Sequence, residues 1–153
     1  MSTDPLRGPL AEYPATIRLP VQWGDQDAFG HVNNTVYFRW FESARIKYLE
    51  RIELSEQTAE GALGPILAAV NCNYRRQVKY PDHVVIGARI TQIGRSSLKM
   101  SYSVWSEAQQ ATVADGDSTI VAFDYRLNKS QPVPAELRAK IARIEGKTFD
   151  AAS

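Results

Sequence analysis

The sequence predicts an α+β fold in which one antiparallel sheet wraps around one long helix. A single long segment with a helical repeat of apolar residues follows the first strand-like segment. Several strand-like segments come after it with no helices between them, so parallel crossover connections are not expected. The chain has 153 residues, 44% of them hydrophobic, which suits one domain around one core.

The first expected strand covers residues 16–23. Apolar Ile17, Leu19 and Val21 alternate there with polar residues or proline, which is the period of a half-buried strand. Because Pro20 has no N–H to donate, this strand is expected at a sheet edge or at a bulge. Residues 24–34 are rich in Gly, Asp and Asn and are expected to form a loop.

A helix is expected from Thr35 to about Ile52. Its apolar residues fall on one broad side of the helix: Val36, Tyr37, Trp40, Phe41, Ala44, Tyr48 and Ile52. At the α-helical repeat these side chains cover an arc of roughly 220°, wider than the stripe of a surface helix. The helix must therefore be surrounded by other parts of the fold.

Strand-like patterns recur in four later segments, at residues 66–80, 83–93, 98–104 and 118–127. The pair Asp115-Gly116 predicts a turn or bulge just before the last of these strands, and Asp115 and Asp117 are expected to be solvated there. Residues 135–144 follow two prolines and suit a short terminal helix, because proline is tolerated near a helix start.

These elements predict one domain at residues 15–147, with flexible segments at residues 1–14 and 148–153. A single sheet around a single helix leaves its edges and outer face uncovered. A homo-oligomer is therefore expected, either a dimer or a homotetramer.

Composition excludes several functional classes. The 18 basic and 17 acidic side chains give a net charge of +1, so nucleic acid is not an expected partner. Cys72 is the single cysteine, which favours a reducing, cytoplasmic location. The sequence has neither a signal peptide pattern nor an apolar stretch long enough to span a membrane. With only two histidines, a histidine-based metal site is not expected.

The chemically richest segment runs from Trp23 to Arg45 and reads WGDQDAFGHVNNTVYFRWFESAR. It places carboxylates, a histidine and two asparagines directly before a helix start. The first turn of a helix has unpaired N–H groups and partial positive charge, so it can hold an oxyanion, while a nearby carboxylate can act as a base or nucleophile. The same residue types also form turns and helix caps, and spacing alone leaves both interpretations open.

Taken whole, this segment resembles the signature W-x-D-x-D-x-x-G-H-V-N-N-x-x-Y-x-x-W-x-E-x-A-R of the 4-hydroxybenzoyl-CoA thioesterase-like family. The strand order expected for the rest of the chain agrees with that resemblance. It implies a hotdog fold, an antiparallel sheet wrapped around one long central helix. It also implies an acyl-CoA thioesterase that needs no cofactor, since coenzyme A enters as part of the substrate.

The resemblance assigns roles to particular residues. Asp27 matches the catalytic carboxylate, the backbone N–H near Asn34 matches the oxyanion donor, and His31 matches a supporting residue of the same pocket. The residues expected at the substrate are Gly30, Asn33, Tyr37, Trp40 and Phe41, together with Asn71 and Asn73 of the partner subunit. The residues expected to hold coenzyme A are Arg75, Arg76, Lys79, Arg95, Ser96 and Ser97. Each of these four cations also suits a solvated strand end.

Two other functions remain open from the sequence. One is a protein that binds acyl-CoA or another hydrophobic acid without catalysis, and the other is a hotdog hydratase or dehydratase. The sequence has no G-x-G-x-x-G, no phosphate-binding loop and no G-x-S-x-G elbow, so dinucleotide, nucleotide triphosphate and serine hydrolase functions are not favoured. The acyl chain, the choice between coenzyme A and acyl carrier protein, and the choice between nucleophile and base for Asp27 cannot be read from it.

Overall fold

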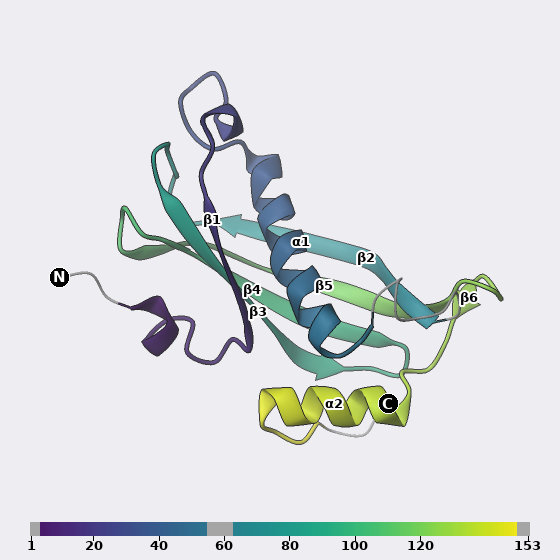
Figure 1. Ribbon diagram of the computed structural model, residues 1–153. Helices are drawn as coiled ribbons and strands as arrows, with labels where there is room; N and C mark the ends of the chain where they lie inside the picture. The colour runs from purple at the N-terminus through teal and green to yellow at the C-terminus, as the bar shows by residue number, and fades with distance from the viewer. Residues whose placement is uncertain (1–3, 55–62, 150–153) are drawn as a thin grey trace.

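The computed structural model describes residues 4–54 and 63–149, and it contains a curled antiparallel sheet with one long helix against its inner face (Figure 1). The elements in chain order are η1 (Pro5–Arg7), β1 (Ala15–Pro20), η2 (Trp23–Asp25), α1 (Asn34–Arg51), β2 (Leu63–Tyr74), β3 (His83–Ile93), β4 (Ser97–Ser106), β5 (Ala111–Asp124), β6 (Lys129–Ser130) and α2 (Ala135–Glu145). The strand order is β1-β3-β4-β5-β2, and the short β6 pairs with β5. The predicted α+β fold is therefore confirmed.

Helix α1 begins directly after its N-cap residue, Asn33. The Asn33 side-chain oxygen accepts a hydrogen bond from the Thr35 N–H at 3.0 Å, as an N-cap does. All of the apolar residues predicted for its broad face are buried. Phe41 is completely buried, and its ring stacks on Tyr102 of the sheet with centroids 4.5 Å apart. The curled sheet covers this wide apolar arc of the helix.

Strand β1 lies at one edge of the sheet, where Pro20 is tolerated. It pairs antiparallel with β3, and Pro20 lies opposite His83 at the end of that pairing. Since an edge strand has one side without ladder partners, the missing N–H of proline breaks no sheet hydrogen bond there. The edge position predicted from Pro20 is confirmed.

The turn predicted at Asp115-Gly116 is wrong, because both residues lie inside β5. Gly116 pairs with Cys72 on one side and Tyr102 on the other. A Cβ at this position would come within 2.1 Å of the Asn71 carbonyl oxygen and 2.8 Å of the Phe41 ring. The glycine therefore permits close approach of a neighbouring strand and the central helix, which is the other use of glycine in a strand.

Strand β2 ends at Tyr74 rather than at the predicted Tyr80. The backbone N–H groups of Arg75 and Arg76 both donate to the Val113 carbonyl, at 2.8 and 3.1 Å. Two donors on one acceptor end the regular ladder, since each further strand residue needs an acceptor of its own. The chain then continues as a loop to His83.

Helix α2 closes the opposite end of the fold, as its sequence predicted. Leu137 and Ile141 are buried against the sheet. Glu145 accepts hydrogen bonds from the Tyr48 hydroxyl at 2.6 Å and from the Ile90 N–H at 2.9 Å. Ile90 lies beyond Ala88, the last residue of β3 that pairs with β1, and Glu145 of α2 supplies the acceptor for its N–H there.

The segment before β1 covers part of the outer face of the sheet. Leu10 is buried against Val85 and Trp105, and Tyr13 packs over Gly87. Residues 1–3 and 150–153 of the segments predicted to be flexible lie outside the described residues. In the described part of the chain, no helix has the length and apolar character needed to cross a membrane.

Candidate functional site

The loop between η2 and α1 is closed on itself and projects beyond the start of the central helix (Figure 1). Gln26 and Val32 form an isolated antiparallel bridge, and the Asp27 N–H donates to the His31 carbonyl at 2.8 Å. Gly30 has a φ of 79°, a left-handed conformation that glycine adopts without the Cβ penalty. Gly30 thus shapes the loop that carries Asp27.

The Asp27 carboxylate has two oxygens with different surroundings. Its Oδ1 accepts hydrogen bonds from the Phe29 N–H at 2.8 Å and, more weakly, from the His31 N–H at 3.4 Å. Its Oδ2 has no hydrogen-bond partner among the described residues. One oxygen therefore holds the loop in shape, and the other is open to a ligand.

The first turn of α1 presents one open donor. The Thr35 N–H is taken by the Asn33 side chain, and the Val36 N–H donates to the Asn33 carbonyl at 3.0 Å. The Asn34 N–H, by contrast, makes no hydrogen bond to any residue in the described ranges. The partial positive charge of a helix start lies at this group, so the site favours a negatively charged atom.

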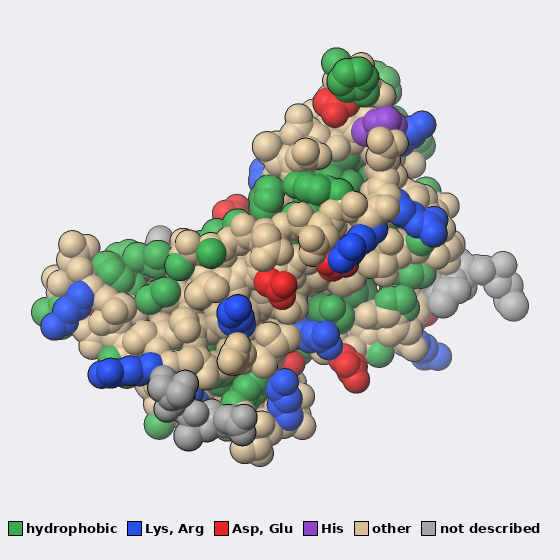
Figure 2. Space-filling model, turned by 180° about the vertical axis from the view of Figure 1, so that it is seen from behind, with side chains coloured by type: hydrophobic (Ala, Val, Ile, Leu, Met, Phe, Trp, Pro, Cys, Tyr) green, Lys and Arg blue, Asp and Glu red, His purple; other side chains and the backbone are tan. Residues whose placement is uncertain are grey.

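Asp27 and Asn34 line the same open cavity of about 570 Å³. The full lining is Asp27, Phe29, His31, Val32, Asn34, Tyr37, Tyr74, Arg75, Arg76 and Gln77. These residues come from the loop, the start of α1, and the end of β2 with the segment after it. Figure 2 shows this projecting end of the molecule from behind, with acidic, basic, histidine and hydrophobic side chains gathered at its surface.

Two tyrosines form the inner wall of the cavity. The rings of Tyr37 and Tyr74 meet edge to face with centroids 4.9 Å apart, and the Tyr74 hydroxyl donates to the Asn34 carbonyl at 3.1 Å. Burial raises the pKa of Tyr37 to about 12. Both phenols stay protonated near neutral pH, so they serve as walls and hydrogen-bond donors rather than as bases.

The two adjacent arginines of the cavity differ in how far their charges are already paired. Arg75 donates to both carboxylate oxygens of Asp115, at 2.9 and 3.2 Å, and Asn73 donates to the same carboxylate. This pair raises the pKa of Arg75 and lowers the pKa of Asp115. The Arg76 guanidinium has no partner within the described part of the chain. Arg76 is therefore the cavity cation that is left for an anionic ligand.

The two acids of the Asp25-Gln26-Asp27 unit also have different roles: Asp25 stabilises the fold, and Asp27 lines the cavity. Asp25 is buried, accepts a hydrogen bond from the Gln22 N–H at 2.8 Å, and lies 3.6 Å from the Arg39 guanidinium. Its backbone carbonyl accepts from the Asn33 N–H at 2.9 Å. Asp25 therefore fixes the loop that leads into α1, which agrees with the interpretation of these residues as turn formers and helix caps.

Several residues predicted at the substrate lie outside this cavity in the single chain. Asn33 caps α1, Phe41 belongs to the core, and Trp40 lines a second cavity of about 250 Å³ beside β1. Asn71 and Asn73 alternate along β2 with residues packed on the core, so their side chains point to the outer face of the sheet.

Of the residues predicted to hold coenzyme A, likewise only some line this cavity. Arg75 and Arg76 line the cavity, and Lys79 is exposed in the loop that follows them. The segment Arg95–Ser97 lies at the far end of β3, beside the start of α2, where the Arg95 carbonyl accepts from the Val133 N–H at 2.8 Å. One chain therefore does not bring these two groups together.

Four residues that the sequence did not single out complete the lining: Phe29, Val32, Tyr74 and Gln77. Tyr74 lies on the same face of β2 as Cys72, so strand alternation could have found it. Val32 joins the loop to the 75–82 segment, since its N–H donates to the Val78 carbonyl at 2.8 Å. Phe29 is 85% exposed in a polar loop, and no periodic pattern marks it.

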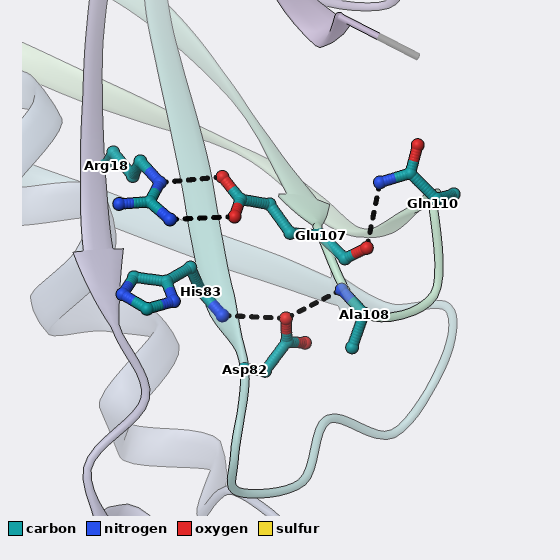
Figure 3. Close-up of polar contacts among 6 residues, drawn as sticks. All are labelled: Arg18, Asp82, His83, Glu107, Ala108 and Gln110. Atoms are coloured by element: carbon teal, nitrogen blue, oxygen red, sulfur yellow. Dashed lines mark hydrogen bonds and ion pairs between the residues drawn. The ribbon is translucent and has the colours of Figure 1, made fainter. Parts of the chain in front are cut away.

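The segment at residues 75–82 is fixed at its far end by the network in Figure 3. The Asp82 carboxylate accepts from the His83 N–H at 2.7 Å and from the Ala108 N–H at 2.8 Å. Beside it, Arg18 of β1 makes two hydrogen bonds to Glu107, at 2.7 and 2.9 Å. These contacts tie β1, β3 and the β4–β5 connection together.

Comparisons with known proteins match the chain to one family. The family model described as the Thioesterase-like superfamily matches residues 21–141. The chain is similar to the long-chain acyl-CoA thioesterase FadM of Escherichia coli (strain K12), at 28% identity over 118 residues that cover 77% of this chain and 89% of that protein. It is also similar to a chloroplastic acyl-acyl carrier protein thioesterase of Arabidopsis thaliana, at 24% identity over 84% of this chain and 67% of that protein.

A solved structure extends the comparison to three dimensions. A thioesterase from Thermus thermophilus, crystallised with coenzyme A and zinc, is 32% identical and has a TM-score of 0.79 over 90% of this chain and 98% of that chain. The similarity in structure confirms the predicted hotdog fold. In residues 4–54 and 63–149 of the present chain, no three His, Cys, Asp or Glu side chains are grouped as metal ligands would be.

Proposed function

This chain belongs to the Thioesterase-like superfamily and is a thioester hydrolase, and we propose that it hydrolyses acyl-CoA thioesters in the cavity between Asp27 and the start of α1. One observation carries this proposal. Asp27, whose Oδ2 is an open acceptor, and Asn34, whose N–H is an open donor, line the same cavity. Thioester hydrolysis needs both, because water must lose a proton while the carbonyl oxygen gains negative charge.

The proposed reaction proceeds through a tetrahedral intermediate. Asp27 Oδ2 accepts a proton from a water molecule as that water attacks the thioester carbon, and the carbonyl oxygen becomes an oxyanion that accepts from the Asn34 N–H. The C–S bond then breaks, and the proton passes from Asp27 to the leaving thiolate, giving the free acid and the thiol of coenzyme A. An oxyanion donor typically contributes on the order of 10² to 10³ in rate, and a base roughly 10² to 10⁴. No cysteine or serine nucleophile is needed.

Direct attack by Asp27 is the alternative to water activation, and isotopic labelling separates the two. In a single turnover in ¹⁸O-water, activation of water places the label in the released acid. Attack by Asp27 displaces the thiolate of coenzyme A and forms an anhydride, and hydrolysis of that anhydride at the Asp27 carboxyl carbon places the label in the Asp27 side chain. Mass spectrometry of the peptide containing Asp27 measures which route is taken.

The central experiment compares the release of free thiol from a panel of acyl-CoAs by the wild type and Asp27→Asn. The variant keeps the size of the side chain and an oxygen for the loop, but it removes the base, so turnover should fall by roughly 10² to 10⁴. Asp117→Asn is the matched control, because Asp117 is exposed in β5 and does not line the cavity. Equal activity of Asp27→Asn and the control would refute the assignment.

The same assays separate the two other functions open from the sequence. Binding of acyl-CoA without release of thiol would indicate a non-catalytic binding protein. Hydration of an enoyl-CoA, measured as loss of the conjugated double bond, would indicate a hydratase. The match to the Thioesterase-like superfamily over residues 21–141 favours hydrolysis over both.

A homo-oligomer remains part of the proposed function. Strand β2 pairs only with β5 in the described chain, so one edge of a long strand is left for a second copy. A second copy is also needed if Asn71, Asn73 and the Arg95–Ser97 turn are to reach the cavity, since within one chain they point elsewhere. Native mass spectrometry at micromolar concentration tests this, and a monomer would rule out their predicted roles.

A further inference from the structure

The Tyr74 hydroxyl contacts the residue that carries the proposed oxyanion donor. Tyr74 is the last residue of β2, lines the cavity and is 43% exposed. Its hydroxyl donates to the Asn34 carbonyl at 3.1 Å, where β2 ends beside the start of α1 (Figure 1). The proposed reaction uses the Asn34 N–H and the Asp27 carboxylate, and it gives Tyr74 no part. That reaction by itself therefore does not explain the contact.

This hydrogen bond connects the first turn of α1 to the sheet. The cap of the helix is internal, because the Asn33 side-chain oxygen accepts hydrogen bonds only from Thr35. Within the part of the chain that the structure describes, the bond from Tyr74 is the only hydrogen bond between residues 34–37 and a strand of the sheet. Without it, the position of Asn34 relative to the sheet depends on packing alone.

Aromatic packing fixes the direction in which the Tyr74 hydroxyl points. The Tyr74 ring meets the Tyr37 ring edge to face, with centroids 4.9 Å apart and an interplanar angle of 89°. Tyr37 is buried, and its ring packs in turn against Trp40, also with centroids 4.9 Å apart. Burial raises the pKa of Tyr74, so its hydroxyl stays protonated near neutral pH and remains a donor. The Asn34 carbonyl is therefore bound by a donor whose ring is itself held in place.

An oxyanion donor is effective only when it is correctly placed. Such donors lie about 2.7–3.1 Å from the oxygen on which charge develops, and a displacement of about 1 Å can lower the rate roughly 10²-fold. Because helical backbone angles fix the N–H of a residue relative to its C=O, a bond to the Asn34 carbonyl also orients the Asn34 N–H. We propose that Tyr74 is a positioning residue that holds the Asn34 N–H toward the thioester carbonyl oxygen. This inference rests on the proposed function and adds a residue that acts through Asn34 without touching the reacting atoms.

The first test removes the Tyr74 hydroxyl and keeps the ring. Tyr74→Phe should lower kcat for acyl-CoA by about 10- to 100-fold and leave KM within about twofold, because substrate still binds while the oxyanion is poorly stabilised. Tyr125→Phe is the matched control, since Tyr125 is also 43% exposed and its hydroxyl donates to the Pro65 carbonyl at 2.7 Å, outside the cavity. Urea unfolding should show similar losses of stability in the two variants. Equal kcat values for Tyr74→Phe and Tyr125→Phe would overturn the proposal.

A second test separates positioning from a general change in the shape of the cavity. Two analogues of one acyl-CoA bind without being hydrolysed: a ketone, in which a methylene group replaces the sulfur, and a thioether, which lacks the carbonyl oxygen. Tyr74→Phe should weaken binding of the ketone by about two- to tenfold, the range of one lost hydrogen bond, and leave binding of the thioether unchanged. Calorimetry measures both affinities. Equal weakening of the two analogues would mean that Tyr74 only shapes the cavity, and the proposal would be wrong.

Asp27→Asn distinguishes failure of this proposal from failure of the proposed function. If Asp27→Asn loses hydrolysis while Tyr74→Phe keeps the kcat of the wild type, only the role of Tyr74 is refuted. If Asp27→Asn keeps hydrolysis, the proposed function fails. The two analogues then still decide, by binding alone, whether Tyr74 positions the Asn34 N–H.

Discussion

The two ends of α1 use the same kinds of side chain in opposite ways. At the carboxyl end, the Glu145 carboxylate accepts from both the Tyr48 hydroxyl and the Ile90 N–H. At the amino end, one oxygen of the Asp27 carboxylate accepts a hydrogen bond from its own loop. Its second oxygen and the Asn34 N–H have no partner among the described residues. The difference indicates that completed hydrogen bonds stabilise one end, and incomplete ones leave the other free to bind a ligand.

The burial of tyrosine side chains differs between the two ends of α1 in the same way. Tyr48 is completely buried, and the loss of water together with its bond to Glu145 raises its pKa far above the ordinary value. Tyr74, at the cavity, is 43% exposed. A side chain closed off from water stabilises a fold, whereas one facing an open cavity is accessible to substrate.

The largest expected effect separates activity from stability at the cavity end. Asp27→Asn should lower kcat for acyl-CoA by roughly 10² to 10⁴ and change the free energy of unfolding by less than about 0.5 kcal/mol, because Asp27 is exposed. Steady-state kinetics and urea unfolding measure the two quantities. If the free energy of unfolding changed by several kcal/mol while kcat persisted, Asp27 would stabilise the fold rather than serve activity, and this difference between the two ends would be refuted.

The opposite result is expected at the other end of the helix. Glu145→Ala leaves the Tyr48 hydroxyl and the Ile90 N–H without their acceptor, which should lower the free energy of unfolding by about 2 to 4 kcal/mol. The kcat of the folded protein should not change, since Glu145 does not line the cavity that contains Asp27. Glu136→Ala is the control on the same helix, because the Glu136 side chain is 85% exposed. A similar loss in both variants would show that the buried acceptor is not the cause.

The neighbouring arginines offer a smaller test within the cavity itself. Arg76→Ala should raise the KM for acyl-CoA by about fivefold, and the effect should shrink at high salt because the guanidinium is exposed. Arg75→Ala should change KM less, since its charge is already matched by Asp115. Initial rates at two salt concentrations measure both. A larger effect for Arg75 would mean that the ion pair opens when substrate binds.

Side-chain periodicity predicted most of the fold from the sequence. The arc of apolar residues on α1, the edge strand with Pro20 and the helix at residues 135–144 all follow from local patterns, and the structure contains them. The error at Asp115-Gly116 arose because glycine serves both turns and close backbone approach, and only the packing of Asn71 and Phe41 against Gly116 separates these uses.

The candidate site was harder to predict because its residues are defined by hydrogen bonds that are not made. Asp25 and Asp27 look equivalent in the sequence, yet one carboxylate is buried in a cap and the other faces a cavity. Arg75 and Arg76 are likewise distinguished only by Asp115, which lies far along the chain. Such differences depend on tertiary contacts, so a short sequence window does not contain them.

The smallest expected effect is a pH dependence carried by the Arg75–Asp115 ion pair. The pair lowers the pKa of Asp115, so its stabilisation is fully present above the unfolded pKa of aspartate, about 3.9, and is lost as the pH falls through the lower folded value. Because both side chains are partly exposed, solvent screens the pair and its contribution is small. Asp115→Asn should therefore unfold at lower urea than the wild type at pH 7, and the gap should narrow as the pH falls below about 4. Asp117→Asn, on the same strand but outside the pair with Arg75, is the control, and an equal gap in that variant would assign the effect to net charge instead.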